Sequence, residues 1–311
     1  MKPRVAIATG DPAGIGPEIS IKAARDPRVR EICEPVLFGD REVLSMHGDV
    51  GDLRVAEVKQ QRPRLGTIDP EHGRAALAAA EAAIRAALKG EYAAVVGAPH
   101  TEAAIHAAGI EFDGYPSFVA RVTGLAPDDG ILMLCLRHEE REIRIAHVTL
   151  HTSVARALQL ITTQRVMKTI RATHSALVAL GIAAPRIAVS GVNPHAGEGG
   201  AFGREEIDIV QPAIEAARRE MTVDGPIGAD TLIQRLGYDA YIVMLHDQGH
   251  VAAKLLAPQR VAALTIGTPV LFSSVGHGSA LDIAGLGRAN PDAVIEAITR
   301  LVGRRRRAAA T

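Results

Sequence analysis

Residues 5–18 read VAIATGDPAGIGPE, a short apolar run that leads into a glycine-rich turn and then into Pro17, a residue suited to open a helix. The turn lacks the G-x-G-x-x-G spacing of a dinucleotide-binding loop because residue 19 is Ile, and no Gly-Lys-Ser/Thr makes it a P-loop. A tight turn that needs glycine backbone freedom therefore fits the stretch better than a phosphate cradle, although the cradle stays open.

The same alternation of short apolar runs and longer helical patterns continues along the chain. Runs at 35–38, 93–97, 131–136, 143–148, 186–190 and 240–244 predict strands, as does 5–9. Residues 72–88, 164–180 and 205–219 carry apolar side chains at three- and four-residue spacing and predict helices. The alternation predicts an α/β fold with a mostly parallel sheet. Aromatic residues make up only 3% of the chain, so Ala, Val, Leu and Ile have to fill its core.

A chain of 311 residues is long enough for two lobes. Gly, Pro and Asp cluster at 125–130, and a second crossing is expected within 249–267. Because chains of two-lobed α/β enzymes often cross between lobes more than once, we expect residues 1–311 to form a single unit with two interleaved lobes.

Composition excludes several classes of protein. The chain is 47% hydrophobic and 23% charged, unlike a disordered chain, and its 35 basic and 35 acidic residues leave no global field for nucleic acid or an anionic membrane. The basic run Arg304 to Arg307 is better explained as a solvated end than as an RNA or membrane contact. Two cysteines suggest no disulfide framework, and no apolar run reaches the roughly 18 residues of a membrane span. We therefore expect a cytoplasmic protein.

Three histidines follow predicted strands: His151, His195 and His246. Ligands of open parallel sheets lie beyond the carboxyl ends of the strands, so these imidazoles could converge. Three imidazoles with water or substrate oxygens would form a catalytic divalent-metal site with an open position. The alternative is that each histidine is a separate surface residue.

The neighbours of these histidines favour the metal site. Residues 193–200, NPHAGEGG, form a glycine-rich polar loop of the kind built around a ligand. Residues 245–250, LHDQGH, place Asp247 where it could orient a histidine or shuttle a proton. Lys254 follows among apolar neighbours and is a candidate for general acid/base work, with a lysine that extends to solvent as the alternative.

Segments 10–18, 193–198, 246–249 and 277–285 resemble, in order and over essentially the whole chain, the signature segments of the 4-hydroxythreonine-4-phosphate dehydrogenase family. The resemblance implies a homodimer with a two-lobed fold similar to isocitrate and isopropylmalate dehydrogenases and an active-site cleft between the lobes. It also implies metal ligation by His151, His195 and His246, the last from the partner subunit, and a catalytic role for Lys254, with Asp247 as a second group for proton transfer.

The resemblance further implies a nicotinamide cofactor, NAD or alternatively NADP. Its expected position is near Asn193 and near Ser274, Gly276 and Asp282. Zinc suits three imidazoles best, and manganese, cobalt or nickel are alternatives.

The chain departs from the vitamin B6 enzymes of this family in its expected substrate pocket. Tyr115-Pro116 replaces a His-Thr pair, and Ala263 and Phe272 replace an Asn and the Arg expected to pair with phosphate. A phosphate dianion would lose its partner there, at a cost of several kcal/mol.

These replacements point to another branch. Segments 99–106, 114–117, 147–151, 246–250, 254–258 and 273–280 resemble the terephthalate cis-dihydrodiol dehydrogenases. The implied reaction is NAD-linked oxidative decarboxylation of a cis-dihydrodiol carboxylate to protocatechuate and carbon dioxide. The alternatives are the vitamin B6 enzyme itself and, from another class, a non-catalytic metal-binding protein.

Overall fold

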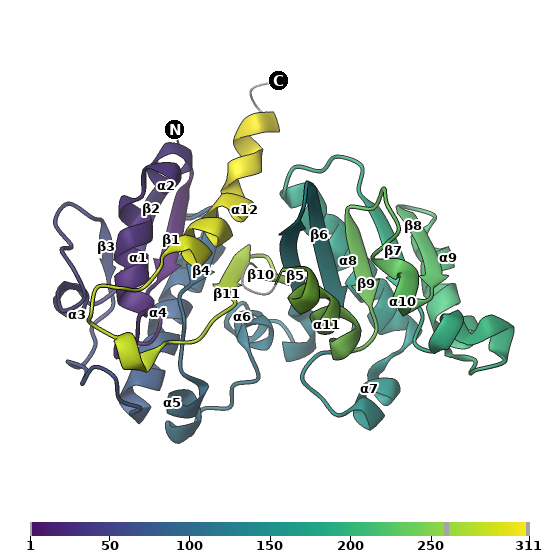
Figure 1. Ribbon diagram of the computed structural model, residues 1–311, viewed down its shortest axis with the longest axis horizontal. Helices are drawn as coiled ribbons and strands as arrows, with labels where there is room; N and C mark the ends of the chain where they lie inside the picture. The colour runs from purple at the N-terminus through teal and green to yellow at the C-terminus, as the bar shows by residue number, and fades with distance from the viewer. Residues whose placement is uncertain (1, 258–260, 309–311) are drawn as a thin grey trace. The chain divides into compact units, whose positions relative to one another are not determined.

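The computed structural model describes residues 2–257 and 261–308, with side chains up to residue 302. The chain forms two compact units, one of residues 1–130 and 268–311 (unit 1) and one of residues 131–267 (unit 2). The chain therefore enters unit 2 after Gly130 and returns to unit 1 after Gly267 (Figure 1). The side chains of Arg304 to Arg307, and all of Pro258, lie outside the described residues.

Unit 1 is built on a parallel sheet in the order β3-β2-β1-β4-β11. Its strands are β1 (Arg4–Ala8), β2 (Glu34–Gly39), β3 (Val55–Glu57), β4 (Ala94–Gly97) and β11 (Phe272–Val275). Because all five run in one direction, the loops that follow β1, β4 and β11 emerge at the same edge of the sheet. The last strand of this sheet comes from the C-terminal part of the sequence, so the chain completes unit 1 only after it has passed through unit 2.

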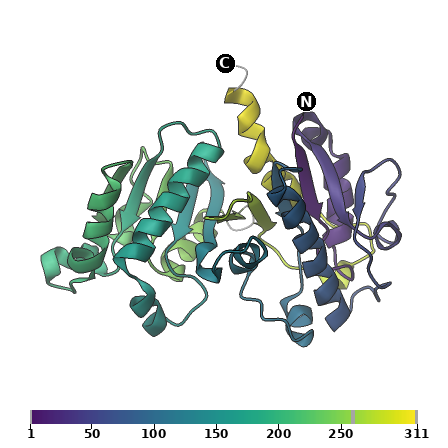
Figure 2. The same cartoon turned by 180° about the vertical axis from the view of Figure 1, so that it is seen from behind.

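Helices cover both faces of the unit 1 sheet. They are α1 (Gly16–Arg25), α2 (Pro27–Ile32), α3 (Arg41–Ser45), α4 (Pro70–Leu88), α5 (Glu102–Ala107), α6 (Tyr115–Val122) and α12 (Asp292–Ala308), with short 3-10 turns at Pro127–Asp129 and Leu281–Ile283. Helices α1 and α12 lie in front of the sheet in Figure 1, and α4 lies on the opposite face, as Figure 2 shows from behind. Asp69 begins α4 by accepting a hydrogen bond from the Glu71 amide, and Pro70 occupies the first turn.

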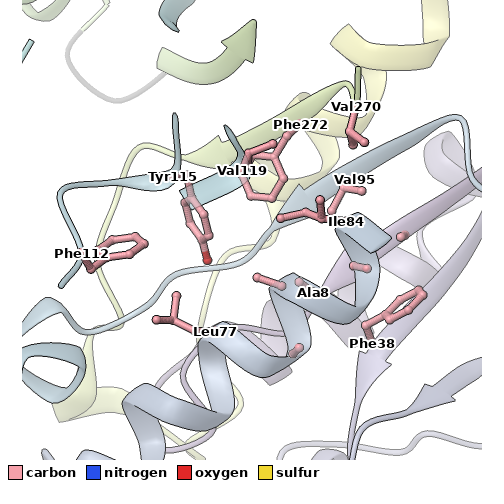
Figure 3. Packing of buried hydrophobic residues seen from close by; sticks show 14 of the residues in the cluster. Ala8, Phe38, Leu77, Ile84, Val95, Phe112, Tyr115, Val119, Val270 and Phe272 are labelled. Atoms are coloured by element: carbon pink, nitrogen blue, oxygen red, sulfur yellow. The ribbon is translucent and has the colours of Figure 1, made fainter. Parts of the chain in front are cut away.

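The core of unit 1 is mostly small and aliphatic, as the composition predicts. Alanines of α4 pack against Ala8, Val36 and Val95 of the sheet. The exception is one corner where Phe112, Tyr115 and Phe272 gather beside Val119 (Figure 3). The Tyr115 and Phe272 rings lie 4.6 Å apart, and both side chains are buried. Most aromatic residues of unit 1 are thus concentrated in this corner, and Phe38 with Tyr92 forms a separate pair in the same core.

Unit 2 has a mixed sheet in the order β10-β5-β6-β9-β7-β8. The strands are β5 (Ile131–His138), β6 (Arg141–His147), β7 (Arg186–Ser190), β8 (Thr222–Ile227), β9 (Ala240–Val243) and β10 (Val261–Ile266). Strand β5 pairs antiparallel with β6 and β10, and the other neighbours are parallel. The helices are α7 (Val154–Leu160), α8 (Thr163–Ala179), α9 (Gln211–Ala217), α10 (Ala229–Leu232) and α11 (His246–Leu256).

The α/β fold with a mostly parallel sheet is confirmed. Each strand predicted from sequence falls on an observed strand, and the helices predicted at 72–88 and 164–180 match α4 and α8. The helix predicted at 205–219 is instead a π-helical turn, Glu206–Val210, followed by the shorter α9. The sequence pattern missed β3, β8 and β11 because these strands are short or carry Gly, Pro and Ser, and it missed β10 because residues 249–267 were assigned to a crossing between lobes. Among the described residues, no helix has the length and apolar character needed to cross a membrane.

Gly97 sets the spacing of the aromatic corner. A Cβ atom at this position would lie 2.8 Å from Cζ of Phe272 and 3.2 Å from Cζ of Tyr115. Both rings are buried and have little room to retreat, so we predict that Gly97→Ala lowers the free energy of unfolding by about 1–3 kcal/mol, measured by urea denaturation.

Gly278→Ala is the matched control for this substitution. A Cβ atom at Gly278 meets no heavy atom within 4 Å, so its effect should stay within about 0.5 kcal/mol. Equal losses for the two variants would show that the corner tolerates an added methyl group.

Candidate active site

Three loops meet at the carboxyl edge of the unit 1 sheet. They follow β1, β4 and β11, and each contains one of the segments singled out from sequence. The amide of Ile15 donates to the Ser279 carbonyl at 2.8 Å, and the amide of Asp11 donates to the Pro99 carbonyl at 2.8 Å. The glycine-rich turn is therefore a tight turn held against two other loops.

Asp11 is the polar centre of this junction. Its carboxylate is almost wholly buried and accepts the amide of Ala13 at 2.9 Å and the hydroxyl of Thr101. Thr101 is also hydrogen-bonded to Oγ of Ser279 at 2.9 Å. A buried carboxylate is stable only when hydrogen-bonded, so these bonds fix the three loops relative to one another.

The three residues of unit 1 expected near the cofactor lie at the end of β11 and in the loop after it. Ser274 is half-buried at the end of β11, whereas Gly276 and Asp282 are exposed in the loop beyond it. The far end of this loop is held by Glu18, whose carboxylate accepts the amide of Ala289 at 2.8 Å. The structure therefore presents these three positions on a loop anchored at both ends.

Four histidines gather at the carboxyl edge of the unit 2 sheet. The rings of His151 and His246 have centroids 5.7 Å apart, and the rings of His246 and His250 stack at 3.8 Å. His147 lies 4.8 Å from His250. Burial, together with the neighbouring His246, lowers the pKa of His250 to about 4. The structure thus brings together two of the predicted metal ligands and adds two histidines to them.

His147 is the buried member of this group. Burial lowers its pKa to about 3, and its Nε2 atom has no hydrogen-bond partner within the described residues. A Cβ atom at Gly249 would lie 2.3 Å from that Nε2, so only glycine fits at this point of α11. The glycine of the 245–250 segment is explained by this close approach.

Asp247 and Gln248 fix the start of α11 through their side chains. Nδ1 of His246 lies 2.6 Å from a carboxylate oxygen of Asp247, an arrangement that orients the imidazole. Oε1 of Gln248 accepts the amides of Met244 at 2.9 Å and Leu245 at 3.0 Å, and its Nε2 donates to the Gly191 carbonyl at 3.2 Å. Gln248 therefore ties the end of β9 to the end of β7.

The loop after β7 is shaped by Glu206. This buried carboxylate accepts the amides of Val192 and Asn193, both at 2.7 Å, and Nδ2 of Asn193 at 2.9 Å. Asn193 also donates to Glu205 at 2.7 Å, and this bond is the main cause of the lowered pKa of Glu205. The Asn193 amide, expected to contact the cofactor, is thus engaged in holding its own loop.

His195 lies in a strained part of this loop. His195, Ala196 and Glu198 all have positive φ, at 52°, 51° and 43°. Non-glycine residues adopt this left-handed region at a cost of about 1–3 kcal/mol and do so mainly at functional sites. The ring of His195 lies against that of Phe202, with centroids 6.3 Å apart, and not against the histidines of the other strand ends.

The donor set fits a metal only in part within one chain. The 5.7 Å between the His151 and His246 rings suits two imidazoles that share one ion at about 2.0–2.1 Å. However, the described residues contain no group of three or more His, Cys, Asp or Glu side chains arranged to hold one. The chemistry of the two imidazoles fits a divalent ion, but the described residues of one chain supply no third ligand beside them.

The remaining predicted residues take several positions. Lys254 is exposed in the last turn of α11, so its apolar neighbours do not enclose it. Ala263 is half-buried on β10, opposite Leu134. Tyr115 and Phe272 are buried in the aromatic corner of unit 1, and the burial of Tyr115 raises the pKa of its hydroxyl.

Sequence reasoning overlooked several groups at these edges. His250 could have been found from its four-residue spacing to His246, which places both on one helix face. The hydrogen-bonded junction of Asp11, Thr101 and Ser279 joins residues far apart in sequence, and no local sequence pattern predicts it.

Both units place fixed polar loops or a histidine cluster at the carboxyl ends of parallel strands, where α/β proteins bind small ligands. Comparison with known proteins identifies the class more closely. The family described as pyridoxal phosphate biosynthetic protein PdxA matches residues 28–301, so the chain belongs to this family.

The relatives are dehydrogenases. The 1,2-dihydroxy-3,5-cyclohexadiene-1,4-dicarboxylate dehydrogenase of a Comamonas species is 44% identical over 96% of both chains. The solved terephthalate 1,2-cis-dihydrodiol dehydrogenase of Burkholderia xenovorans is 41% identical, with a TM-score of 0.75 over 97% of this chain and 98% of that one. The solved 4-hydroxythreonine-4-phosphate dehydrogenase of Klebsiella pneumoniae is 32% identical, with a TM-score of 0.82 over 96% and 98%. The chain is therefore a dehydrogenase.

The predicted likeness to isocitrate dehydrogenases also holds for the fold. The enzyme of Methylococcus capsulatus has a TM-score of 0.52 at 16% identity over 99% of this chain and 88% of that one. At this identity the comparison speaks for the fold alone.

Glu206 gives a test of how the His195 loop is held. In Glu206→Gln the new NH2 group has to face one of three donors, so we predict a loss of about 1.5–3 kcal/mol in unfolding free energy. Hydrogen exchange should also become faster at the amides of Val192 and Asn193. The adjacent Glu205→Gln changes a half-buried carboxylate that accepts Asn193 and should cost less than about 1 kcal/mol. If the two variants behave alike, Glu206 is not what holds the loop.

Proposed function

We propose that this dehydrogenase catalyses the oxidative decarboxylation of a cis-dihydrodiol carboxylate. The substrate that fits best is terephthalate 1,2-cis-dihydrodiol, which with NAD would give protocatechuate, carbon dioxide and NADH. The name of the Comamonas relative, at 44% identity, supports this choice.

The observation that carries the proposal is the environment of Phe272. In the vitamin B6 enzymes that the chain resembles, this position belongs to the arginine that pairs with phosphate. Here the side chain is wholly buried among Val95, Val119 and Tyr115, with no charge of its own. A phosphorylated substrate would lose a cation at this point, whereas an apolar ring requires none.

The aromatic corner supports a ring-shaped substrate. Four of the nine Phe and Tyr residues of the chain gather there: Phe112, Tyr115, Phe118 and Phe272. His100, at the carboxyl end of β4, meets the rings of Phe112 and Tyr115 edge-on at 4.9 Å each. The rings of Phe112, Tyr115 and Phe272 are themselves buried, so the half-buried His100 is the member of this group proposed to face a ring-shaped substrate.

The proposed chemistry begins with a secondary alcohol next to the carbon that bears the leaving carboxylate. When bound, NAD accepts the hydride and a divalent ion polarises the oxygens of the substrate. Asp247 holds the imidazole of His246 in one orientation for its ligand role. Lys254 is the group proposed to accept and return protons, and the exposed Asp247 is the alternative. Loss of carbon dioxide from the resulting β-keto acid restores the aromatic ring.

We further propose that the chain works as a homodimer through unit 2. Large apolar side chains are exposed on several of its elements, and the set comprises Val154, Leu158, Val178, Phe202, Ile207, Leu236, Val251 and Leu255. Leu255 is 77% exposed and lies next to Lys254. Contact with a second copy would bury such side chains. It would also bring His195 of one chain to the His151 and His246 pair of the other, whereas the family resemblance implies that His246 is the ligand from the partner subunit.

The substrate can be tested directly. We predict that the purified protein forms NADH and protocatechuate from terephthalate 1,2-cis-dihydrodiol, with kcat/KM at least roughly 100-fold above that for 4-phosphohydroxy-threonine. Absorbance of NADH and chromatography of the product measure the two outcomes. The same assay with NADP in place of NAD establishes the cofactor preference.

Equal or better turnover of 4-phosphohydroxy-threonine would instead identify the vitamin B6 reaction. Turnover of D-threonate 4-phosphate would identify a third reaction, which several relatives carry in their names. No turnover of any alcohol together with tight metal binding would favour the non-catalytic metal-binding protein.

The metal can be tested without turnover. We predict close to one divalent ion per chain, most readily zinc, measured by elemental mass spectrometry of the purified protein. His151→Ala, His195→Ala and His246→Ala should each lose most of the ion. His174→Ala, a half-buried histidine of α8, is the matched control and should retain it.

A mixture of the His195→Ala and His246→Ala proteins separates the two ways of building the site. If ligands come from both chains, hybrid dimers regain one complete set and part of the metal content returns. Hybrids that form, as shown by native mass spectrometry, but bind no metal would contradict a shared site.

A further inference from the structure

A hollow of about 510 Å³ opens in unit 2 beside His195. It is formed by the end of β8, the turn that follows it and the segment before β9. Its polar lining comprises His195, Asp224, Arg235 and Tyr238. The sequence analysis assigned no role to the last three of these residues.

The acidic group of the hollow is already neutralised. Oδ2 of Asp224 accepts the Tyr238 hydroxyl at 2.9 Å and lies 3.9 Å from a guanidinium nitrogen of Arg186. That guanidinium also covers the Tyr238 ring, with its Cζ 5.2 Å from the ring centroid. The carboxylate of Asp224 is thus hydrogen-bonded to Tyr238 and paired with Arg186. It has little remaining attraction for a second cation.

Arg235 is the cation of the hollow without a counter-charge. Its guanidinium makes no hydrogen bond or ion pair with any side chain that the structure describes, and the residue is exposed. With Arg186 and Asp224 paired, Arg235 is the remaining charged side chain of the lining, and the carboxylate of Asp230 stands at its edge beside Gly228. A guanidinium offers two parallel N–H donors that match a carboxylate, which makes it the side chain of choice for recognising one.

We propose that this hollow is a carboxylate-binding subsite and that Arg235 recognises the ring carboxylate that is not lost in the reaction. The inference rests on the proposed function, because it takes the substrate to be a dicarboxylate. The substrate carries one carboxylate on the carbon that is decarboxylated and another across the ring. With the reacting end at His195, one ligand of the proposed metal, the adjoining hollow receives the opposite end of the ring. Arg235 is then a specificity-determining residue.

Two substrates isolate the second carboxylate. Terephthalate 1,2-cis-dihydrodiol has both groups, whereas the cis-dihydrodiol of benzoate that is hydroxylated at the carboxylate-bearing carbon has only the one that leaves. We expect Arg235→Gln to lower kcat/KM for the dicarboxylate by about 10- to 100-fold, mainly through KM, and to change that for the monocarboxylate by less than about 3-fold. Arg235→Lys retains the positive charge but loses the two parallel N–H donors. Its kcat/KM for the dicarboxylate should lie between those of the unmodified protein and Arg235→Gln. Arg171→Gln removes an exposed cation of the same unit and is the matched control.

A binding measurement keeps this inference separate from the proposed reaction. Protocatechuate retains only the carboxylate assigned to Arg235, and catechol has none. By calorimetry, Arg235→Gln should weaken protocatechuate binding by about 10- to 100-fold and leave catechol binding unchanged. This result without any dihydrodiol turnover would uphold the subsite and remove the proposed reaction.

Other results overturn the subsite. Equal losses for both substrates and both ligands would give Arg235 a structural role. Unchanged values throughout, or a protein that binds protocatechuate no better than catechol, would show that no carboxylate is recognised in the hollow. Circular dichroism of each variant confirms that the fold is retained.

Discussion

The parallel hydrogen bonding of β1 with β4 and of β6 and β7 with β9 is the constraint on which the rest of the structure depends. Parallel neighbours have to end at the same edge of a sheet, so their following loops meet there even when long stretches of sequence separate them. In unit 1 this brings Asp11, Thr101 and Ser279 into one hydrogen-bonded junction. In unit 2 it places His151 beside His246.

Polar side chains then hold in place the loops that strand pairing brings close together. Asp11, Gln248 and Glu206 each join loop segments that lie beyond the ends of the paired strands. All three make several bonds in buried or half-buried positions, where an unsatisfied polar atom is costly. Their role is to make the loops rigid before a ligand arrives, and rigidity of this kind lowers the entropy lost on binding.

The sequence predicted those parts of the fold and site that depend on local pattern. Apolar runs of four or more residues gave the central strands, and polar residues just after them gave His151, His195 and His246 as candidates. The pattern missed β11 because its Phe-Ser-Ser-Val lacks a continuous apolar run, and it could not show that His195 lies against Phe202 rather than with the other two. The left-handed backbone around His195 and the pairing of Asp224 with Tyr238 arise from tertiary contacts. No periodicity in the chain encodes them.

The two groups of residues proposed to define the reaction belong to separately packed bodies. The histidine cluster rests on the core of unit 2, whereas the aromatic corner around Phe272 is part of the core of unit 1. Each group is held in place by contacts within its own unit. Under the proposed function, exchanges at 115 and 272 change the substrate that is accepted while the histidines stay in place. The coexistence of phosphorylated amino acid and dihydrodiol substrates among the names of its relatives is what such modular inheritance produces.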